Sequence, residues 1–285
     1  MKAPSFAYAK PDSLAGVFDL LERHREGAKI LAGGQSLLAT LNLRLSSPAL
    51  LVDIAGVPGL SGITVRDGIL RIGALTTHRE IEQSADIRKH VPLLAQAVPH
   101  IAHLAIRNAG TFGGSIAMAD PAAEFPACAL ALDATFVIAS RKGERRAGAK
   151  EFFRSLYETT LGTGDVLIAG EFKVQPHGYR SVFLELARRR GDYAIVGLAA
   201  HARFESGRFS DVRLAFLGVG VTPVLAKSAA AALEGMAYGS ASVSAAQAEL
   251  ARDLDPPKDL YNSSATKLHL ARVLTGRALA ALASG

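Results

Sequence analysis

Cysteine is almost absent from this sequence, and its scarcity excludes several kinds of chemistry. Cys128 is the only cysteine among 285 residues. A single cysteine can form no intrachain disulfide, and it cannot supply the several thiolates that a zinc site or an iron–sulfur cluster takes. We therefore expect Cys128 to be a small buried apolar residue.

Metal-binding and acid–base patterns are missing as well. Eight histidines are present, and none has the HExxH spacing of a zinc enzyme. His100 and His103 lie three apart, but no cysteine or acidic residue stands beside them, so a place at a helix end or in a pocket wall is the better interpretation. Nothing resembles a nucleophile or acid–base constellation. We predict neither a metal site nor a catalytic side chain.

Long apolar runs and aromatic-rich basic stretches are also lacking. No apolar run approaches the length of a bilayer crossing. The charged residues Lys2, Lys10 and Asp12 stand at the start of the chain, which therefore lacks the apolar core of a signal peptide. We expect a cytoplasmic protein with no membrane span. Tryptophan is absent and aromatics make up 6% of the chain, so the net charge of +6 lacks the aromatic-interleaved basic stripe of a nucleic-acid binder. The basic clusters at 141–146 and 188–190 indicate solvated faces or a subunit contact.

What the sequence does contain is a pair of glycine-rich loops. Residues 32–36 read Ala-Gly-Gly-Gln-Ser, and residues 111–115 read Thr-Phe-Gly-Gly-Ser. Glycine permits close approach of a ligand and positive φ, so successive N–H groups can line one concavity, which suits an anion. One such loop is usually only a turn, whereas two together suit a diphosphate held from both sides.

Apolar periodicity predicts a βαβ unit at the start of the chain. A strand is expected at 6–8, a helix after Asp12 or Ser13, and a strand at 29–31 that runs into the first glycine loop. A further short strand is expected at 50–53.

The next part of the chain reads as mixed helix and strand. A hairpin is expected at 62–72 with Asp67-Gly68 as its turn, followed by a helix capped by Thr77. A helix at 127–132 and strands at 135–139 and 166–174 follow.

Beyond a boundary near residue 176 the pattern changes. Three strands are expected at 179–186, 194–204 and 212–219. An alanine-rich helical region follows, and its last helix should span about 264–282.

Ordered motifs along the chain are similar to those of one family. They are AGGQSLL at 32–38, NLRL at 42–45, LVDI at 51–54, LRIGALT at 70–76, IRN at 106–108, TFGGS at 111–115, ADPAAE at 119–124, RRGDYA at 189–194 and LARVL at 270–274. This set resembles the FAD-binding medium subunit of molybdenum hydroxylases, the group of carbon monoxide dehydrogenase, quinoline and nicotine dehydrogenases and the central region of xanthine dehydrogenase. It covers essentially the whole chain.

The resemblance implies an α+β fold in two domains. Residues 1–176 would form an FAD-binding domain of the p-cresol methylhydroxylase or vanillyl-alcohol oxidase type, in two parts of about 1–56 and 57–176. Residues 177–285 would form a carbon monoxide dehydrogenase flavoprotein-like domain, with a three-stranded antiparallel sheet and a helix bundle. FAD would lie between the two parts of the first domain.

The resemblance also implies which residues contact FAD. The two glycine loops would wrap the diphosphate and ribityl region, Glu124 would accept from a ribose hydroxyl, and Tyr193 would lie near the isoalloxazine. From the residues alone, Glu124 could instead cap a helix and Tyr193 could be an ordinary strand residue. The predicted contacts are Ile30, Leu31, Ala32, Gly33, Gly34, Gln35, Ser36, Leu37, Ile101, Thr111, Phe112, Gly113, Gly114, Ser115, Glu124, Leu167, Leu184 and Tyr193. Neither loop holds a histidine, so we expect noncovalent FAD.

The lack of a catalytic cluster fits an electron-transfer subunit, because a flavin carries its own chemistry. The resemblance implies a small partner subunit with [2Fe–2S] clusters, a large partner subunit with the molybdenum cofactor, an external electron acceptor, and a dimer of heterotrimers. Two alternatives stay open. One is a self-contained flavin oxidase or reductase of the same fold, for which the C-terminal part is small. The other is a binding module that has lost its flavin, against which the intact glycine pairs argue.

Overall fold

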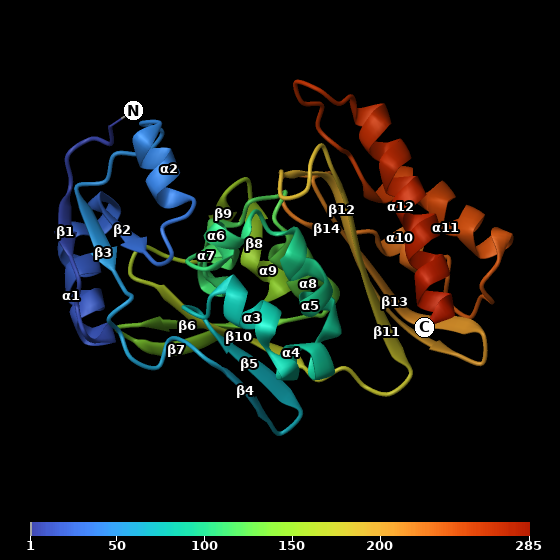
Figure 1. Ribbon diagram of the computed structural model, residues 1–285, viewed down its shortest axis with the longest axis horizontal. Coiled ribbons are helices and arrows are strands. Elements are labelled where there is room, and N and C mark those ends of the chain that lie inside the picture. Colours follow the sequence, from blue (N-terminus) through green and yellow to red (C-terminus); the bar gives the residue numbers. More distant parts are fainter. Residues whose placement is uncertain (1) are drawn as a thin grey trace.

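The N-terminal part of the molecule is a small parallel sheet flanked by helices (Figure 1). The structure is a computed structural model that describes residues 2–285. Strands β1 (Ala7–Ala9), β3 (Leu50–Asp53) and β2 (Ala28–Leu31) pair in that order, and all run parallel. Helix α1 (Leu14–His24) joins β1 to a short 3-10 turn before β2, and α2 (Leu37–Asn42) follows the first glycine loop. The predicted βαβ unit is confirmed.

Local sequence explains why α1 forms and where it packs. The Ser13 side chain accepts a hydrogen bond from the Gly16 N–H and so caps the helix. Val17, Phe18 and Leu21 recur on one face and are buried against the parallel sheet.

The middle part is a five-stranded antiparallel sheet that helices cover on one side (Figure 1). Its order is β4 (Ile63–Arg66), β5 (Ile69–Gly73), β10 (Val166–Lys173), β6 (Thr135–Ser140) and β7 (Gly143–Gly148). The predicted hairpin is β4–β5, turned at Asp67 and Gly68, which both have positive φ. The covering helices are α3 (His78–Gln83), α4 (Ala85–His90), α5 (Pro92–Ala97), α6 (Leu104–Arg107), α7 (Phe112–Met118) and α8 (Glu124–Ala131). Between β7 and β10 the chain forms a short helix and a two-stranded hairpin, which are α9 (Ala149–Phe152), β8 (Phe153–Ser155) and β9 (Glu158–Thr159).

Helix α8 is the central element of this core. All eight of its residues are buried, and it packs against α5, α7 and α9 as well as against the C-terminal strands. Apart from Glu124 at its start, all residues of this helix are apolar, because the helix meets protein on every side.

The C-terminal part is an antiparallel sheet with helices on its outer face (Figure 1). Strands β11 (Tyr179–Ala187), β12 (Ala194–Glu205) and β13 (Arg208–Leu217) pair in order, and a two-residue strand, β14 (Val224–Leu225), adds a fourth that the sequence did not predict. The third strand also starts earlier than predicted. Helices α10 (Lys227–Ala231), α11 (Ser240–Asp253) and α12 (Ser264–Ser284) cover the outer face.

Two features concern the chain as a whole. The predicted boundary near residue 176 falls between β10 and β11, and it stays a prediction. None of the helices within residues 2–285 combines the length and apolar character that a bilayer crossing requires.

Candidate functional site

The two glycine loops touch each other, and Gly33 makes the contact possible. A Cβ atom built on Gly33 would lie 2.1 Å from the carbonyl oxygen of Ala109, which precedes the second loop. Only a residue without a side chain allows the two backbones this close. The first loop, far away in sequence, therefore lies against the backbone that leads into the second loop.

The first loop, residues 32–37, presents free backbone donors. The N–H groups of residues 33–37 donate no hydrogen bond to any other residue in the range 2–285. Gly34 has a φ of +71°, and the loop is only partly buried. Adjacent free N–H groups around a left-handed glycine make a concavity that binds anions.

The second loop, residues 111–115, was expected to be similar and is not. Its N–H groups are already bonded: Phe112 to the Thr76 oxygen at 2.9 Å, Gly113 to the Ala74 oxygen at 2.8 Å, and Gly114 to the Thr111 hydroxyl at 3.1 Å. None of the residues in this loop has a positive φ, and the loop turns straight into α7. The prediction of free N–H groups there is wrong, because nearby carbonyls and the Thr111 hydroxyl accept hydrogen bonds from them.

Hydroxyl groups remain as donors in the second loop. The Thr111 hydroxyl accepts from Gly114 and keeps its own proton for another partner. The Ser115 hydroxyl forms no hydrogen bond with another described residue, 2–285. The second loop can therefore contact a diphosphate or ribityl chain through side chains more than through its backbone.

His78 contacts the backbone at the start of the second loop. Its backbone N–H donates to the Gly110 oxygen at 2.9 Å, and its Nε2 lies 3.0 Å from the Thr111 oxygen. The ring packs edge-on against Phe125. Burial lowers the pKa of His78 to about 4, so the ring is neutral and Nε2 donates. As predicted, Thr77 caps α3, and Glu80 completes a capping box.

Two carboxyl groups, one buried and one partly buried, lie near each other at Glu124 and Glu185. Glu124 begins α8 and is 9% exposed. Burial, and then the charge of Glu185, raises its pKa to about 8. Burial raises the pKa of Glu185 on β11 to about 7, and its Oε2 has no hydrogen-bond partner among residues 2–285. A buried carboxyl at Glu124 and an unpaired carboxyl oxygen at Glu185 fit the ribose and ribityl hydroxyls of FAD.

Glu185 was missed at the sequence level, although alternation along the strand could have revealed it. Phe183, two residues earlier, packs into the middle core, whereas Leu184 packs against the C-terminal core on the opposite face of β11. The structure does not bring the Leu184 side chain to the side of the carboxyls. The predicted contact at Leu184 stays a prediction, and Glu185 is the neighbouring side chain on the same face of β11 as Phe183.

Two tyrosines flank the carboxyls at the surface. The Tyr157 hydroxyl lies 3.5 Å from Oδ2 of Asp120. Tyr193 is 75% exposed, and the pKa of its hydroxyl is raised by partial desolvation and by the charges of Asp120 and Glu124. Tyr193 thus lies near the carboxyls with its ring open to a ligand or a partner.

The remaining predicted contacts lie in the interior or in the loop walls. Ile101 and Leu167 belong to the middle core and are 8% and 5% exposed. Ile30 and Ala32 pack against the N-terminal core, and Leu31 lies beside Gly34. Their contacts with FAD stay predictions.

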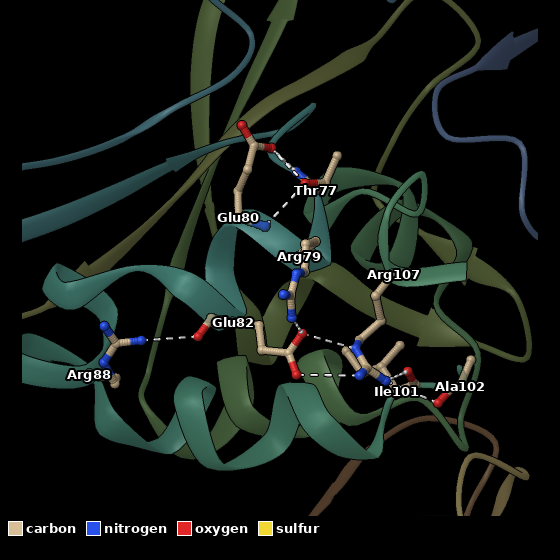
Figure 2. A network of polar contacts seen from close by, with 8 residues as sticks. All are labelled: Thr77, Arg79, Glu80, Glu82, Arg88, Ile101, Ala102 and Arg107. Atoms are coloured by element: carbon tan, nitrogen blue, oxygen red, sulfur yellow. Dashed lines mark hydrogen bonds and ion pairs between the residues drawn. The ribbon is translucent and has the colours of Figure 1, made fainter. Parts of the chain in front are cut away.

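An ion-pair network holds the segment that carries Ile101 (Figure 2). Arg107 donates to both carboxylate oxygens of Glu82 at 3.3 Å, and its NH1 donates to the carbonyls of Ile101 and Ala102 at 3.0 and 3.1 Å. Burial alone would raise the pKa of Glu82, but hydrogen bonds from Arg79 and Arg107 lower it.

The same segment seats the loop that carries Tyr193. Gly191 has a φ of +84°, and a Cβ atom there would lie 2.8 Å from the Ala102 oxygen. Arg107 therefore positions the Tyr193 loop indirectly, through the Ala102 carbonyl. The motif containing Arg107 was visible in the sequence, but its partner Glu82 is 25 positions away.

Comparisons with known proteins show the family to which the chain belongs. A family described as the FAD binding domain in molybdopterin dehydrogenase matches residues 4–171, and the CO dehydrogenase flavoprotein C-terminal domain matches residues 181–282. The chain belongs to this family. It is an FAD-binding medium subunit of the molybdenum hydroxylase type, and the predicted flavin fold is confirmed.

Relatives match over nearly their full length. The chain is 40% identical to the 6-hydroxypseudooxynicotine dehydrogenase complex subunit alpha of Paenarthrobacter nicotinovorans, covering 98% of this chain and 95% of that one. Among solved structures, carbon monoxide dehydrogenase from Hydrogenophaga pseudoflava matches with a TM-score of 0.97 and 34% identity, over 100% of this chain and 99% of that one. Quinoline 2-oxidoreductase from Pseudomonas putida 86 matches with a TM-score of 0.95 and 38% identity, over the same shares.

Membership of the family fixes the cofactor and the enzyme class. The chain is an oxidoreductase subunit whose cofactor is FAD, and the molybdenum cofactor and iron–sulfur clusters belong to other subunits of such complexes. The free N–H groups of residues 33–37 and the carboxyls of Glu124 and Glu185 fit the two kinds of polar group that FAD carries.

Proposed function

We propose that this chain is the electron-transfer subunit of a molybdenum-containing hydroxylase, which receives electrons from an iron–sulfur partner and delivers them to an external acceptor. The observation that supports it best is the set of free N–H donors at 33–37, together with the buried carboxyl of Glu124 and the unpaired Oε2 of Glu185. When bound, FAD supplies redox chemistry that no side chain offers. We also propose a dimer of heterotrimers in the cytoplasm, as expected from the sequence.

Each group then has a distinct task. The N–H groups of residues 33–37 hold the diphosphate, because they are unpaired within residues 2–285 and lie around a glycine with positive φ. Glu124 and Glu185 accept hydrogen bonds from hydroxyls of the ribose and ribityl chain. Tyr193 covers the exposed side of the ring system, and Arg107 keeps its loop in place.

A surface for the iron–sulfur partner lies beside Tyr193. Residues 188–190 are three exposed arginines, and the Arg188 guanidinium lies 4.5 Å from the centre of the Tyr261 ring. Leu260 and Tyr261 are 92% and 72% exposed. Exposed aromatic and arginine side chains next to a redox site suit a protein contact.

Acid precipitation tests the cofactor part of the proposal. We expect a yellow supernatant that contains FAD, because neither glycine loop offers a histidine for covalent attachment. Colour retained on the denatured protein, or FMN in the supernatant, would contradict noncovalent FAD.

Purification from the native host tests the subunit part. We expect two further chains, one with iron–sulfur absorbance and one with molybdenum. An R188E/Y261A variant should lose these partners and keep its FAD, whereas Lys142→Glu, in the exposed β6–β7 turn, should keep both. A lone chain that turns over substrate at ordinary enzyme rates would instead favour the self-contained flavin oxidase.

A further inference from the structure

A polar cavity lies away from the glycine loops, between the middle and C-terminal sheets. Its volume is about 190 Å³, several times the roughly 30 Å³ that one water molecule occupies in the liquid. Leu132, just after α8, lines it, whereas Glu124 stands at the other end of that helix. With a rise of 1.5 Å per residue, the two ends lie about 12 Å apart. The cavity is therefore separate from the site described above.

A hydrogen-bond relay fixes the tautomer of His201 in this cavity. Gln175 donates its Nε2 to the Tyr179 oxygen at 2.9 Å, so its Oε1 accepts from the Ser181 hydroxyl at 2.7 Å. Ser181 has thereby used its only proton, and its Oγ accepts from Nδ1 of His201 at 2.9 Å. The ring proton is on Nδ1, and Nε2 carries a lone pair.

The lone pair of Nε2 has no donor in the protein. Within residues 2–285, no group forms a hydrogen bond to Nε2 of His201, and unlike Nδ1 of His78 this atom is not sealed from the cavity. His201 is 6% exposed, and Tyr179 stacks on its ring at 5.0 Å. Burial, and then the charge of Arg213, lowers its pKa to about 4, so the ring is neutral at physiological pH.

The wall around this acceptor carries two cations and one carboxylate. Lys173 from β10 and Arg213 from β13 line the same cavity. The one carboxylate in the wall, on Asp211, is held by the Tyr179 hydroxyl at 2.7 Å and by Arg213 at 3.5 Å. The cavity thus combines two cations with a neutral acceptor that needs a donor.

We propose that this cavity binds inorganic phosphate in its protonated forms. The phosphate hydroxyl donates to Nε2 of His201, and the anionic oxygens face Lys173 and Arg213. Both forms of phosphate present near neutral pH keep at least one O–H group, whereas sulfate, of similar size and shape, has none. The relay therefore predicts preference for phosphate over sulfate.

Calorimetric titration of the FAD-saturated chain with phosphate and with sulfate tests this. We expect phosphate to bind at least about tenfold more tightly, because sulfate would leave the buried acceptor unpaired and set an anionic oxygen against it. His201→Phe should bring the two affinities to within about twofold. Ser181→Ala removes the oxygen that holds the ring proton of His201 on Nδ1. This variant should therefore also reduce the preference for phosphate over sulfate.

Control variants separate the contribution of positive charge in the cavity from that of the His201 tautomer. Arg213→Gln should weaken both anions, and Lys142→Gln should change neither. Equal binding of the two anions, no phosphate binding, or full preference in His201→Phe would overturn the proposal. Because His201 lies outside the FAD site, a phosphate preference that is lost in His201→Phe reports on this cavity even if the function proposed above is wrong.

Discussion

The two glycine loops meet at Gly33 and Ala109, yet their backbone amides do opposite things. In the first loop the N–H groups of residues 33–37 are free, and in the second Phe112, Gly113 and Gly114 are bonded within the protein. Similar sequences therefore serve two purposes. The first loop keeps its donors for a ligand, whereas the second uses its glycines to pack.

The carboxyl side of the site extends this contrast. Residues 33–37 offer unpaired backbone donors, whereas Glu124 and Glu185 offer carboxyl oxygens, of which Oε2 of Glu185 has no donor among residues 2–285. A molecule with anionic phosphates at one place and hydroxyls at another satisfies both sides at once.

The largest effect on stability is expected in the second glycine loop, residues 111–115. In Gly113→Val, the new Cβ would lie 2.5 Å from the Ala74 Cβ, so the fold should lose about 3 kcal/mol or more. Urea unfolding of the FAD-free chain measures this. Gly164→Val, where no atom lies within 4 Å of the new Cβ, is the control. A Gly113→Val protein of normal stability would show that the second loop does not depend on this packing.

The next effect concerns Glu124 and depends on pH. Its folded pKa is about 8 against an ordinary value of 4.5, so the unfolded chain releases the proton first and stability falls as pH rises between these values. Glu124→Gln should therefore stabilise the FAD-free chain by on the order of 2 kcal/mol at pH 8 and by little near pH 4.5, while weakening FAD binding. Denaturant unfolding at both pH values checks this, with the exposed Glu158→Gln as control. A gain that is equal at both pH values would disprove the role of ionisation.

A smaller loss is expected from the cap of α7. Thr111→Val removes the hydroxyl that accepts from Gly114 and should cost about 1 kcal/mol of stability. Thermal unfolding without FAD measures the loss. Thr111→Ser should retain most of the stability, and a Thr111→Val protein as stable as the parent would argue against the cap.

The smallest effect on stability is expected in the open loop. Ser36 forms no side-chain cap at the start of α2, so Ser36→Ala should change stability by less than about 0.5 kcal/mol. Its FAD dissociation constant should nevertheless rise severalfold, as measured by flavin fluorescence titration. If Ser36→Ala lost stability and kept its affinity for FAD, the first loop would be a packing element and not a ligand-binding one.

Local signals predicted much of the fold because their causes are local. Ser13 and Thr77 cap helices within three residues of themselves, and the turn at Asp67-Gly68 needs only its own backbone conformation. The glycine loops could be located in the same way. Their roles as FAD contacts stay predictions.

Long-range partners explain what could not be predicted. Whether an N–H group is free depends on distant carbonyls, such as those of Ala74 and Thr76 beneath the second loop. The tie between Arg107 and Glu82 likewise depends on the folded chain. The strand β14 has only two residues, too few for a periodic pattern.

The buried helix α8 sets a fixed spacing in the molecule. It has Glu124 at one end and leads into Leu132 at the other, with no exposed side that could absorb a change in length. One inserted residue would turn the far end by about 100° and advance it by about 1.5 Å, rotating Glu124 out of its site or Leu132 out of the cavity wall. Insertions should be tolerated in the exposed β6–β7 turn, whereas the length of α8 is fixed by what stands at its two ends.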